Sequence, residues 1–187
     1  LEVMRTWWRD NGRYVIGGVV LGIVLLAGWT YWQSVKRTAQ LEASALYETL
    51  LNNVASGDVE PAETTAASLY QEYGSTPYAA QARLALARLY MDKGRDQDAA
   101  DVLRGLLDSR GNAELKPVAR LRLARVLLYQ EKAAEAVELL SGQPDNAFSA
   151  RFSEVLGDAY VALGRFDEAA EAYAIAVSED PSRVTVD

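Results

Sequence analysis

An uncharged stretch near the amino end constrains this chain more than any other feature of its sequence. From Tyr14 to Val35, 22 residues run without a single Asp, Glu, Lys or Arg. As a helix rising about 1.5 Å per residue, this stretch is about 33 Å long, close to the ~30 Å hydrocarbon thickness of a bilayer. The sequence therefore predicts a transmembrane helix over residues 14–35.

Aromatic residues flank the stretch on both sides, as they do at the two interfaces of a membrane-spanning helix. These interface anchors are Trp7, Trp8, Trp29, Tyr31 and Trp32. The alternatives are a cleaved signal peptide and the buried core helix of a globular domain. A signal peptide has a shorter apolar core and a cleavage site of small residues, whereas this stretch ends in bulky aromatic side chains.

Positive charges beside the stretch predict its orientation. Three arginines, at positions 5, 9 and 13, precede it, and Lys36 and Arg37 follow it closely. Because cytoplasmic flanks carry more Lys and Arg, this excess of one charge favours an amino end in the cytoplasm. We therefore expect a cytoplasmic segment over residues 1–13 and a domain on the other side of the membrane over residues 36–187.

Two glycines share one face of the predicted span. Gly18 and Gly22 are four residues apart, and a face without side chains lets another helix approach closely. The pair predicts a site of helix packing in the membrane, although glycine is common in membrane helices in any case.

The remainder of the chain repeats the pattern of a helical hairpin. Its clearest copy reads LGDAY at 156–160 and GRFDEA at 164–169, followed by Tyr173 and Pro181. A small residue and an aromatic in the first helix, a turn glycine, a small residue and an aromatic in the second helix, and a closing proline are the tetratricopeptide pattern. Gly164 is placed to end the first helix, and Pro181 follows the second.

The same pattern recurs twice upstream. The small residues Ala87, Ala124 and Gly157 mark successive copies at spacings of 37 and 33 residues, close to the usual repeat length of about 34. A degenerate earlier copy is expected between Ala39 and Tyr73, with its turn near Gly57 and Pro61. The remaining prolines, at 77, 117 and 144, are placed near joins between helices, where they do not interrupt a helix interior.

The predicted fold is therefore all-α. One amino-terminal transmembrane helix precedes a right-handed tetratricopeptide-repeat superhelix of about four helical hairpins. The expected helix pairs are 38–55 with 61–73, 78–92 with 96–108, 115–130 with 133–141, and 150–162 with 166–179. Because no helix breaker separates Trp32 from Leu50, we expect the first repeat helix to continue the membrane helix and to hold the domain close to the bilayer.

Composition argues against several classes of function. The chain has no cysteine and no histidine, so disulfides, Cys/His zinc sites and imidazole-based catalysis are excluded. A net charge of −7 and a pI of about 4.8 argue against nucleic-acid binding. Acidic pairs such as Asp167 and Glu168 fall at expected helix starts, where they complement the helix dipole. We expect neither an enzyme nor a cofactor.

Stacked hairpins form a concave surface that binds other polypeptides. The first helix of each pair lines that surface, and its apolar and arginine positions suit an extended or amphipathic chain. The candidate groove residues are Leu84, Arg88, Met91, Leu121, Arg125, Leu128, Tyr129, Arg151 and Asp158. For each of them, packing between repeats is the alternative role, and for the arginines so is a solvated ion pair.

Particular segments resemble one known family. The stretch WWRDNGR at 7–13, the glycine-bearing span, the exit GWTYWQS at 28–34 and the later LRLARV at 121–126 are similar to the YfgM family of bacterial inner-membrane proteins. The similarity runs along nearly the whole chain, and the Gly-Trp-x-Tyr-Trp exit from the membrane is its most particular element.

The resemblance implies more than the physics of the chain does. Members of that family have one amino-terminal anchor with a cytoplasmic amino end and a tetratricopeptide-like periplasmic domain. They are ancillary subunits of the SecYEG translocon, partnered with the membrane-anchored chaperone PpiD, and help to hand secreted polypeptides to periplasmic chaperones. From the resemblance we expect the family's acidic stretch before the anchor and its further carboxyl-terminal helix to be curtailed in this sequence.

Two other functions are compatible with an anchored repeat domain. One is regulation, in which the repeats sequester a stress-signalling protein. The other is a scaffold that assembles a different membrane complex.

Overall fold

The computed structural model describes residues 2–143 and 147–179, except for the side chains of residues 2–6, 8–13, 15, 19 and 179. Within these ranges it contains eight α-helices, one short 3-10 helix and no strand. The helices are α1 (Glu2–Ser56), α2 (Val59–Glu72), α3 (Pro77–Asp92), α4 (Asp96–Asp108), η1 (Ala113–Leu115), α5 (Lys116–Tyr129), α6 (Ala133–Leu140), α7 (Ser149–Ala162) and α8 (Phe166–Glu179). The chain divides into two compact units, residues 1–42 and residues 43–187.

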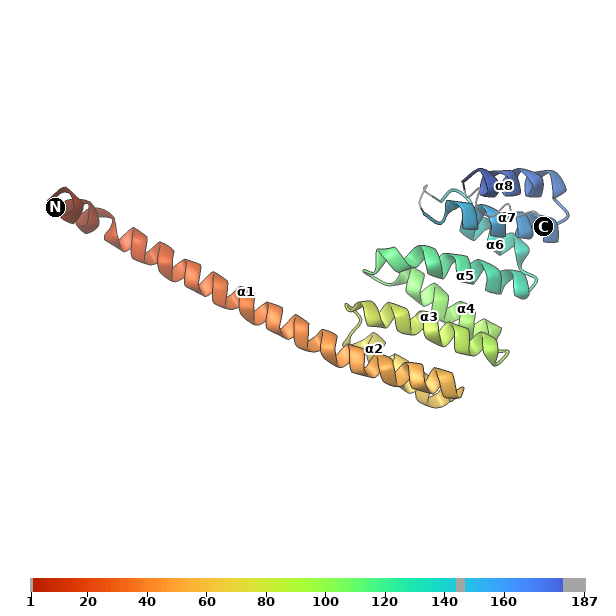
Figure 1. Cartoon of the computed structure of the whole chain (residues 1–187), viewed down its shortest axis with the longest axis horizontal. Coiled ribbons are helices and arrows are strands. Elements are labelled where there is room, and N and C mark those ends of the chain that lie inside the picture. The colour runs from red at the N-terminus through yellow and green to blue at the C-terminus, as the bar shows by residue number, and fades with distance from the viewer. Residues whose placement is uncertain (1, 144–146, 180–187) are drawn as a thin grey trace. The chain divides into compact units, whose positions relative to one another are not determined.

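The second unit is a stack of four helical hairpins. The last turns of α1 pair with α2, followed by α3 with α4, α5 with α6, and α7 with α8 (Figure 1). Buried side chains from all of these hairpins form one continuous apolar cluster. The expected all-α hairpin array is confirmed.

Small residues determine how closely the two helices of each hairpin approach. In the second and third hairpins, small residues at the positions equivalent to Gly157 and Ala169 are all at most 3% exposed, namely Ala87, Ala99, Ala124 and Ala136. In the last hairpin a Cβ on the buried Gly157 would overlap the ring of Tyr173 on α8. The small residues that mark the repeat in the sequence therefore mark the contact seams of the structure, since side chains with more atoms would separate the helices.

The Tyr173 side chain also closes the last hairpin with a polar contact. Its hydroxyl donates a 2.7 Å hydrogen bond to the carboxylate of Asp158 on α7. Burial and this hydrogen bond raise the pKa of Tyr173 to about 12. The tyrosine therefore remains a protonated donor at neutral pH.

Arginines fix two of the hairpin turns. The guanidinium of Arg95 lies 4.5 Å above the Tyr90 ring, and that of Arg165 lies 4.6 Å above the Tyr160 ring. Each arginine also pairs with a carboxylate in the first turn of the following helix, Asp98 or Glu168. These pairs are partly exposed, so they align the turn rather than contribute much stability.

The predicted helix bounds agree with the structure to within two residues at every repeat helix after α1. The turn near Pro61 needs correction, because Pro61 lies in the first turn of α2 rather than in the loop. Proline is tolerated there, since the N–H groups of the first turn have no helical partner. Residue 115 belongs to η1 and not to α5. Pro144 and Pro181 lie outside the described residues.

The first unit is helical from Glu2 onward, and the same helix continues without interruption to Ser56, as the absence of a breaker predicts. Its described stretch contains one candidate membrane span, with a mean hydropathy of 1.4 in an 18-residue window of which no residue is buried. The window's length and composition are those of a membrane-crossing helix.

The turn at residues 130–132 has no glycine at the position where the turns of the other hairpins have one. Gly57, Gly94 and Gly164 occupy the left-handed region at φ of +70° to +75°. The equivalent residue of the third hairpin is Glu131, at φ +61°. A side chain in this conformation is strained by about 1–2 kcal/mol.

Glu131→Gly is therefore expected to raise the free energy of unfolding. The relieved strain exceeds the ~0.5–1 kcal/mol that the extra freedom of glycine costs, which leaves a net gain of about 0.5–1 kcal/mol. Denaturant unfolding of the full chain in detergent, followed by circular dichroism, measures the change. Gly164→Ala is the matched control and should destabilise the protein; a loss of stability in Glu131→Gly would contradict the assigned strain.

Candidate functional site

The described residues offer little for metal chemistry. No group of three or more Asp or Glu side chains is placed to hold a metal ion within the described part of the chain. Several carboxylates are instead engaged in ion pairs that join neighbouring helices. Glu63 accepts hydrogen bonds from both the Tyr90 hydroxyl and the Arg95 guanidinium at 2.8 Å. Such partly exposed groups align neighbouring helices of the scaffold.

A mostly apolar cavity of about 380 Å³ lies between α3 and α5. Met91 and Ala87 of α3, Leu103 of α4, and Val126 and Tyr129 of α5 form its apolar wall. Tyr129 is 69% exposed, so its ring offers open apolar surface with a polar hydroxyl at the edge of the cavity. The arginines Arg88, Arg122 and Arg125 complete the lining.

A second cavity, of about 260 Å³, adjoins the first along the same face. It shares Arg88 and Arg122 with the first cavity and adds residues from the last turns of α1 and from α3. Its remaining lining residues are Tyr47, Leu51, Val54, Gln81, Leu84 and Ala85. The two cavities together form one surface across the first three hairpins, which we call the inner groove.

Cationic side chains are spread along the inner groove, and Arg122 links its two sides. Arg122 Nη1 on α5 donates a 3.1 Å hydrogen bond to the carbonyl oxygen of Leu84 on α3. Arg88 makes only a long, exposed contact of 3.8 Å with Asp92, which contributes little. The lining residues include no acidic side chain, so the inner groove is positive although the whole chain carries −7.

The structure places five of the predicted groove residues in the inner groove. Arg88, Met91, Arg125 and Tyr129 line the first cavity, and Leu84 lines the second. The alternation of exposed arginines with apolar positions on the first helix of each hairpin predicted this grouping.

The other predicted groove residues lie elsewhere. Leu121, at 5% exposure, belongs to the continuous core, as Leu84 does at 8%, and Leu128 packs against that core. Asp158 accepts the hydrogen bond from Tyr173 and so ties α7 to α8. Arg151 is exposed on α7. None of these four residues outside the cavities lines the inner groove as defined above.

Sequence reasoning missed several residues of the inner groove. Arg122 is one helical turn before Arg125 and could have been found from that spacing. Tyr47, Leu51 and Val54 come from α1, whose repeat pattern is too degenerate to assign a register. Tyr47 packs on Tyr78 with ring centroids 5.7 Å apart. Burial raises the pKa of the Tyr47 hydroxyl above its usual value, and nearby Arg122 opposes part of that rise.

The predicted membrane-helix sites lie in the first unit. A Cβ at Gly18 or Gly22 would meet no atom within 4 Å, so this face is open for a partner helix. Trp29 and Trp32 pack with ring centroids 5.7 Å apart, and Lys36 Nζ lies 3.6 Å from the centre of the Trp32 ring. Trp7 and Tyr31 are exposed, and the side chain of Trp8 lies outside the described part of the structure.

Comparison with known proteins finds a matching family model and curated relatives. A family model described as a tetratricopeptide repeat-like domain matches residues 5–185. The "Ancillary SecYEG translocon subunit" of Escherichia coli K12 is 31% identical over 110 residues, 58% of this chain and 52% of the relative. The Haemophilus influenzae protein of the same name is 32% identical over 101 residues, 54% of this chain and 48% of the relative. The chain thus spans about half the length of these curated relatives.

Solved structures share the fold. The crystal structure of MamA matches 83% of this chain and 88% of its own length, with a TM-score of 0.59 and 18% identity. The pilF protein of Pseudomonas aeruginosa matches 78% of this chain and 64% of its own length, with a TM-score of 0.61 and 18% identity. At these identities the likeness concerns the fold alone.

Two substitutions should distinguish a groove residue that supports the core from one that only lines the open surface. Leu84→Ala is expected to lower the free energy of unfolding by about 2–3 kcal/mol, because a buried leucine leaves a cavity. Tyr129→Ala should change it by no more than about 0.5 kcal/mol, because the side chain is mostly exposed. Denaturant unfolding of the full chain measures both values. A large loss of stability in Tyr129→Ala would mean that this side chain serves the core.

Proposed function

Because this chain belongs to the tetratricopeptide repeat-like domain family, we propose that it is a membrane-anchored, non-enzymatic adaptor associated with the SecYEG translocon. The resemblance to the YfgM family is confirmed by the two curated relatives and by the family match over residues 5–185. The observation that carries the proposal is a candidate membrane helix followed by a repeat domain with an open, mostly apolar groove.

The chemistry of the inner groove suits a polypeptide partner. Met91 and Tyr129 offer adaptable apolar contact, and such residues are enriched at the centres of protein interfaces. Arg88 and Arg125 flank them and would pair with acidic or carbonyl groups of a bound chain. The groove thus favours an amphipathic or extended segment with apolar anchors and acidic neighbours.

We propose that a PpiD-like chaperone or an emerging secreted polypeptide occupies this groove. Binding would hold the client near the translocon exit and assist its transfer to periplasmic chaperones. This proposal rests on the names of the relatives, on the resemblance to the YfgM family and on the apolar, positive lining of the groove. A repeat array needs no catalytic residue for such a role, because contact along stacked hairpins supplies the affinity.

The anchor would place the repeats beside the translocon. We propose that residues 14–35 cross the inner membrane with the amino end in the cytoplasm and residues 36–187 in the periplasm. The aromatic anchors would sit at the two interfaces of the bilayer. The open Gly18 and Gly22 face would allow a translocon or partner helix to pack closely against the span.

A photoreactive amino acid in the groove tests the proposed contacts. Placed at Arg125 or Tyr129 in intact cells, it is expected to capture a PpiD-like chaperone or secreted precursors. Ala134, which is exposed on α6, provides the matched control position and should capture neither. With the photoreactive amino acid at Tyr129, the double variant Arg88→Glu/Arg125→Glu should reduce the capture by about tenfold or more, since like charges brought together at an interface are strongly unfavourable. Equal capture from Ala134, or none from the groove, would disprove the groove assignment.

The orientation has an independent test, because the chain contains no cysteine. Single cysteines introduced as Glu2→Cys and Ser141→Cys provide one label site on each side of the predicted span. A membrane-impermeant maleimide added to spheroplasts should label Ser141→Cys only, and lysis should expose Glu2→Cys. The reverse pattern would place the repeats in the cytoplasm and favour a regulatory role over a translocon role.

A further inference from the structure

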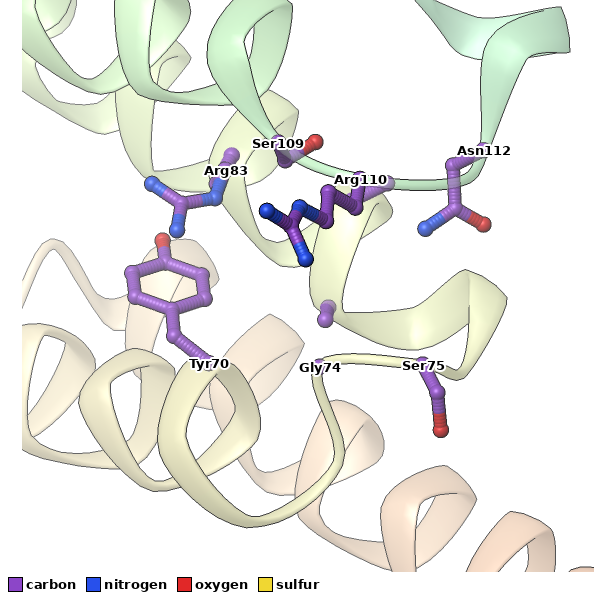
Figure 2. Close-up of a pocket in the computed structure, with 9 residues that line it drawn as sticks. Tyr70, Gly74, Ser75, Arg83, Ser109, Arg110 and Asn112 are labelled. Carbon is purple, nitrogen blue, oxygen red and sulfur yellow. The ribbon is translucent and has the colours of Figure 1, made fainter.

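We propose that a second pocket, on the loop side of the repeat stack, binds an oxyanion, either a carboxylate or a phosphate group. Its volume is about 370 Å³, well above the ~30 Å³ share of one water molecule. It is formed by the end of α2, the start of α3 and the loop after α4 (Figure 2). We call it the loop-side pocket, and it shares no lining residue with the inner groove.

Two arginines give this pocket its charge. Arg83 on α3 and Arg110 in the loop after α4 both line it, and none of its lining residues is acidic. Within the described part of the chain, neither guanidinium makes an ion pair within 4.0 Å. Two guanidinium groups without a carboxylate partner repel each other, and an anion between them removes that repulsion while accepting hydrogen bonds from both.

A buried tyrosine hydroxyl provides a third donor. The Tyr70 Oη atom is shielded from solvent and finds no hydrogen-bond partner among the described residues. Burial raises the pKa of Tyr70, so the hydroxyl keeps its proton. Figure 2 shows this hydroxyl beside the Arg83 guanidinium, with the Arg110 side chain reaching toward them from the loop. An unpaired buried hydroxyl is unfavourable in the free protein, and a bound anion would satisfy it as the flexible arginine side chains shift around the ligand.

Packing and hydrogen bonds hold the walls of the loop-side pocket. The Arg83 guanidinium stacks 4.0 Å from the centre of the Tyr70 ring. Gly105 on α4 makes room for it, since a Cβ there would come within 2.7 Å of Arg83 Nη1. Across the pocket, Asn112 Nδ2 donates a 3.4 Å hydrogen bond to the carbonyl oxygen of Thr76, which links the two loops. The site is therefore built by three helices and two joined loops.

The next hairpin provides an internal comparison. Arg120 on α5 follows Arg83 by 37 residues, the same spacing that separates Ala87 from Ala124. The pocket that Arg120 lines also contains Arg104 together with Asp108, Glu135 and Glu138. There Arg104 Nη2 lies 3.4 Å from Glu135 Oε2, so that pocket contains carboxylates of its own, although Arg120 Nε finds no hydrogen-bond partner among the described residues. Of these two pockets, only the loop-side pocket, which Arg83 lines, has no carboxylate among its lining residues.

Calorimetric titration of the full chain in detergent, at constant ionic strength, tests the proposal. Inorganic phosphate is one probe, and the acetylated peptide Asp-Glu-Asp is the other. Saturable binding of phosphate would indicate a free ion as ligand, whereas binding of the peptide alone would indicate an acidic polypeptide segment. Saturable binding of neither probe would disprove an oxyanion site.

Variants assign the donors. Arg83→Gln/Arg110→Gln should weaken binding at least tenfold, and Arg120→Gln, the matched control, should leave it within about twofold. Tyr70→Phe should also weaken binding by about tenfold while it leaves unchanged, or raises, the midpoint of thermal unfolding without anion. Unchanged affinity in the folded double arginine variant would overturn the site, and unchanged affinity in Tyr70→Phe would remove the hydroxyl from it.

Discussion

The close crossing of two helices at a small residue is the contact on which the repeat domain depends. A single amphipathic hairpin cannot bury its apolar face alone, so each hairpin is stable only when its neighbours cover that face. At the last crossing no larger side chain fits, because the Tyr173 ring fills the space that a Cβ on Gly157 would occupy. The positions of the open surfaces follow from this seam, since it sets the spacing of the first helices of successive hairpins.

Much of this fold could be predicted from the sequence because the small residues of the tetratricopeptide pattern are the ones at which the two helices of a hairpin cross. The positions of Ala87, Ala124 and Gly157 set the register, and the helix bounds then follow from turn glycines and prolines. The prediction was less complete where a side chain carries out an unusual role. Glu131 occupies a turn position that glycine fills elsewhere, and no propensity rule assigns it there.

The candidate site was only partly predictable, for reasons of geometry. A period of 3.6 residues indicates which side of a helix a residue occupies, but not how deep it lies between neighbouring helices. Leu84 and Leu121 share the expected side with Arg88 and Arg125, yet both are almost fully buried. The loop-side pocket combines residues of the stretch 70–83 with residues of the stretch 109–112, and no local pattern brings Tyr70 and Arg110 together.

The placement of tryptophan divides the chain spectroscopically. All four tryptophans precede residue 33, whereas the repeats contain tyrosine and phenylalanine but no tryptophan. Excitation at the red edge of the aromatic band would thus report on the anchor and its lipid surroundings alone. Tyrosine emission, which arises mainly from the repeats, would report on hairpin packing. One unlabelled sample could therefore distinguish loss of membrane insertion from unfolding of the repeat stack.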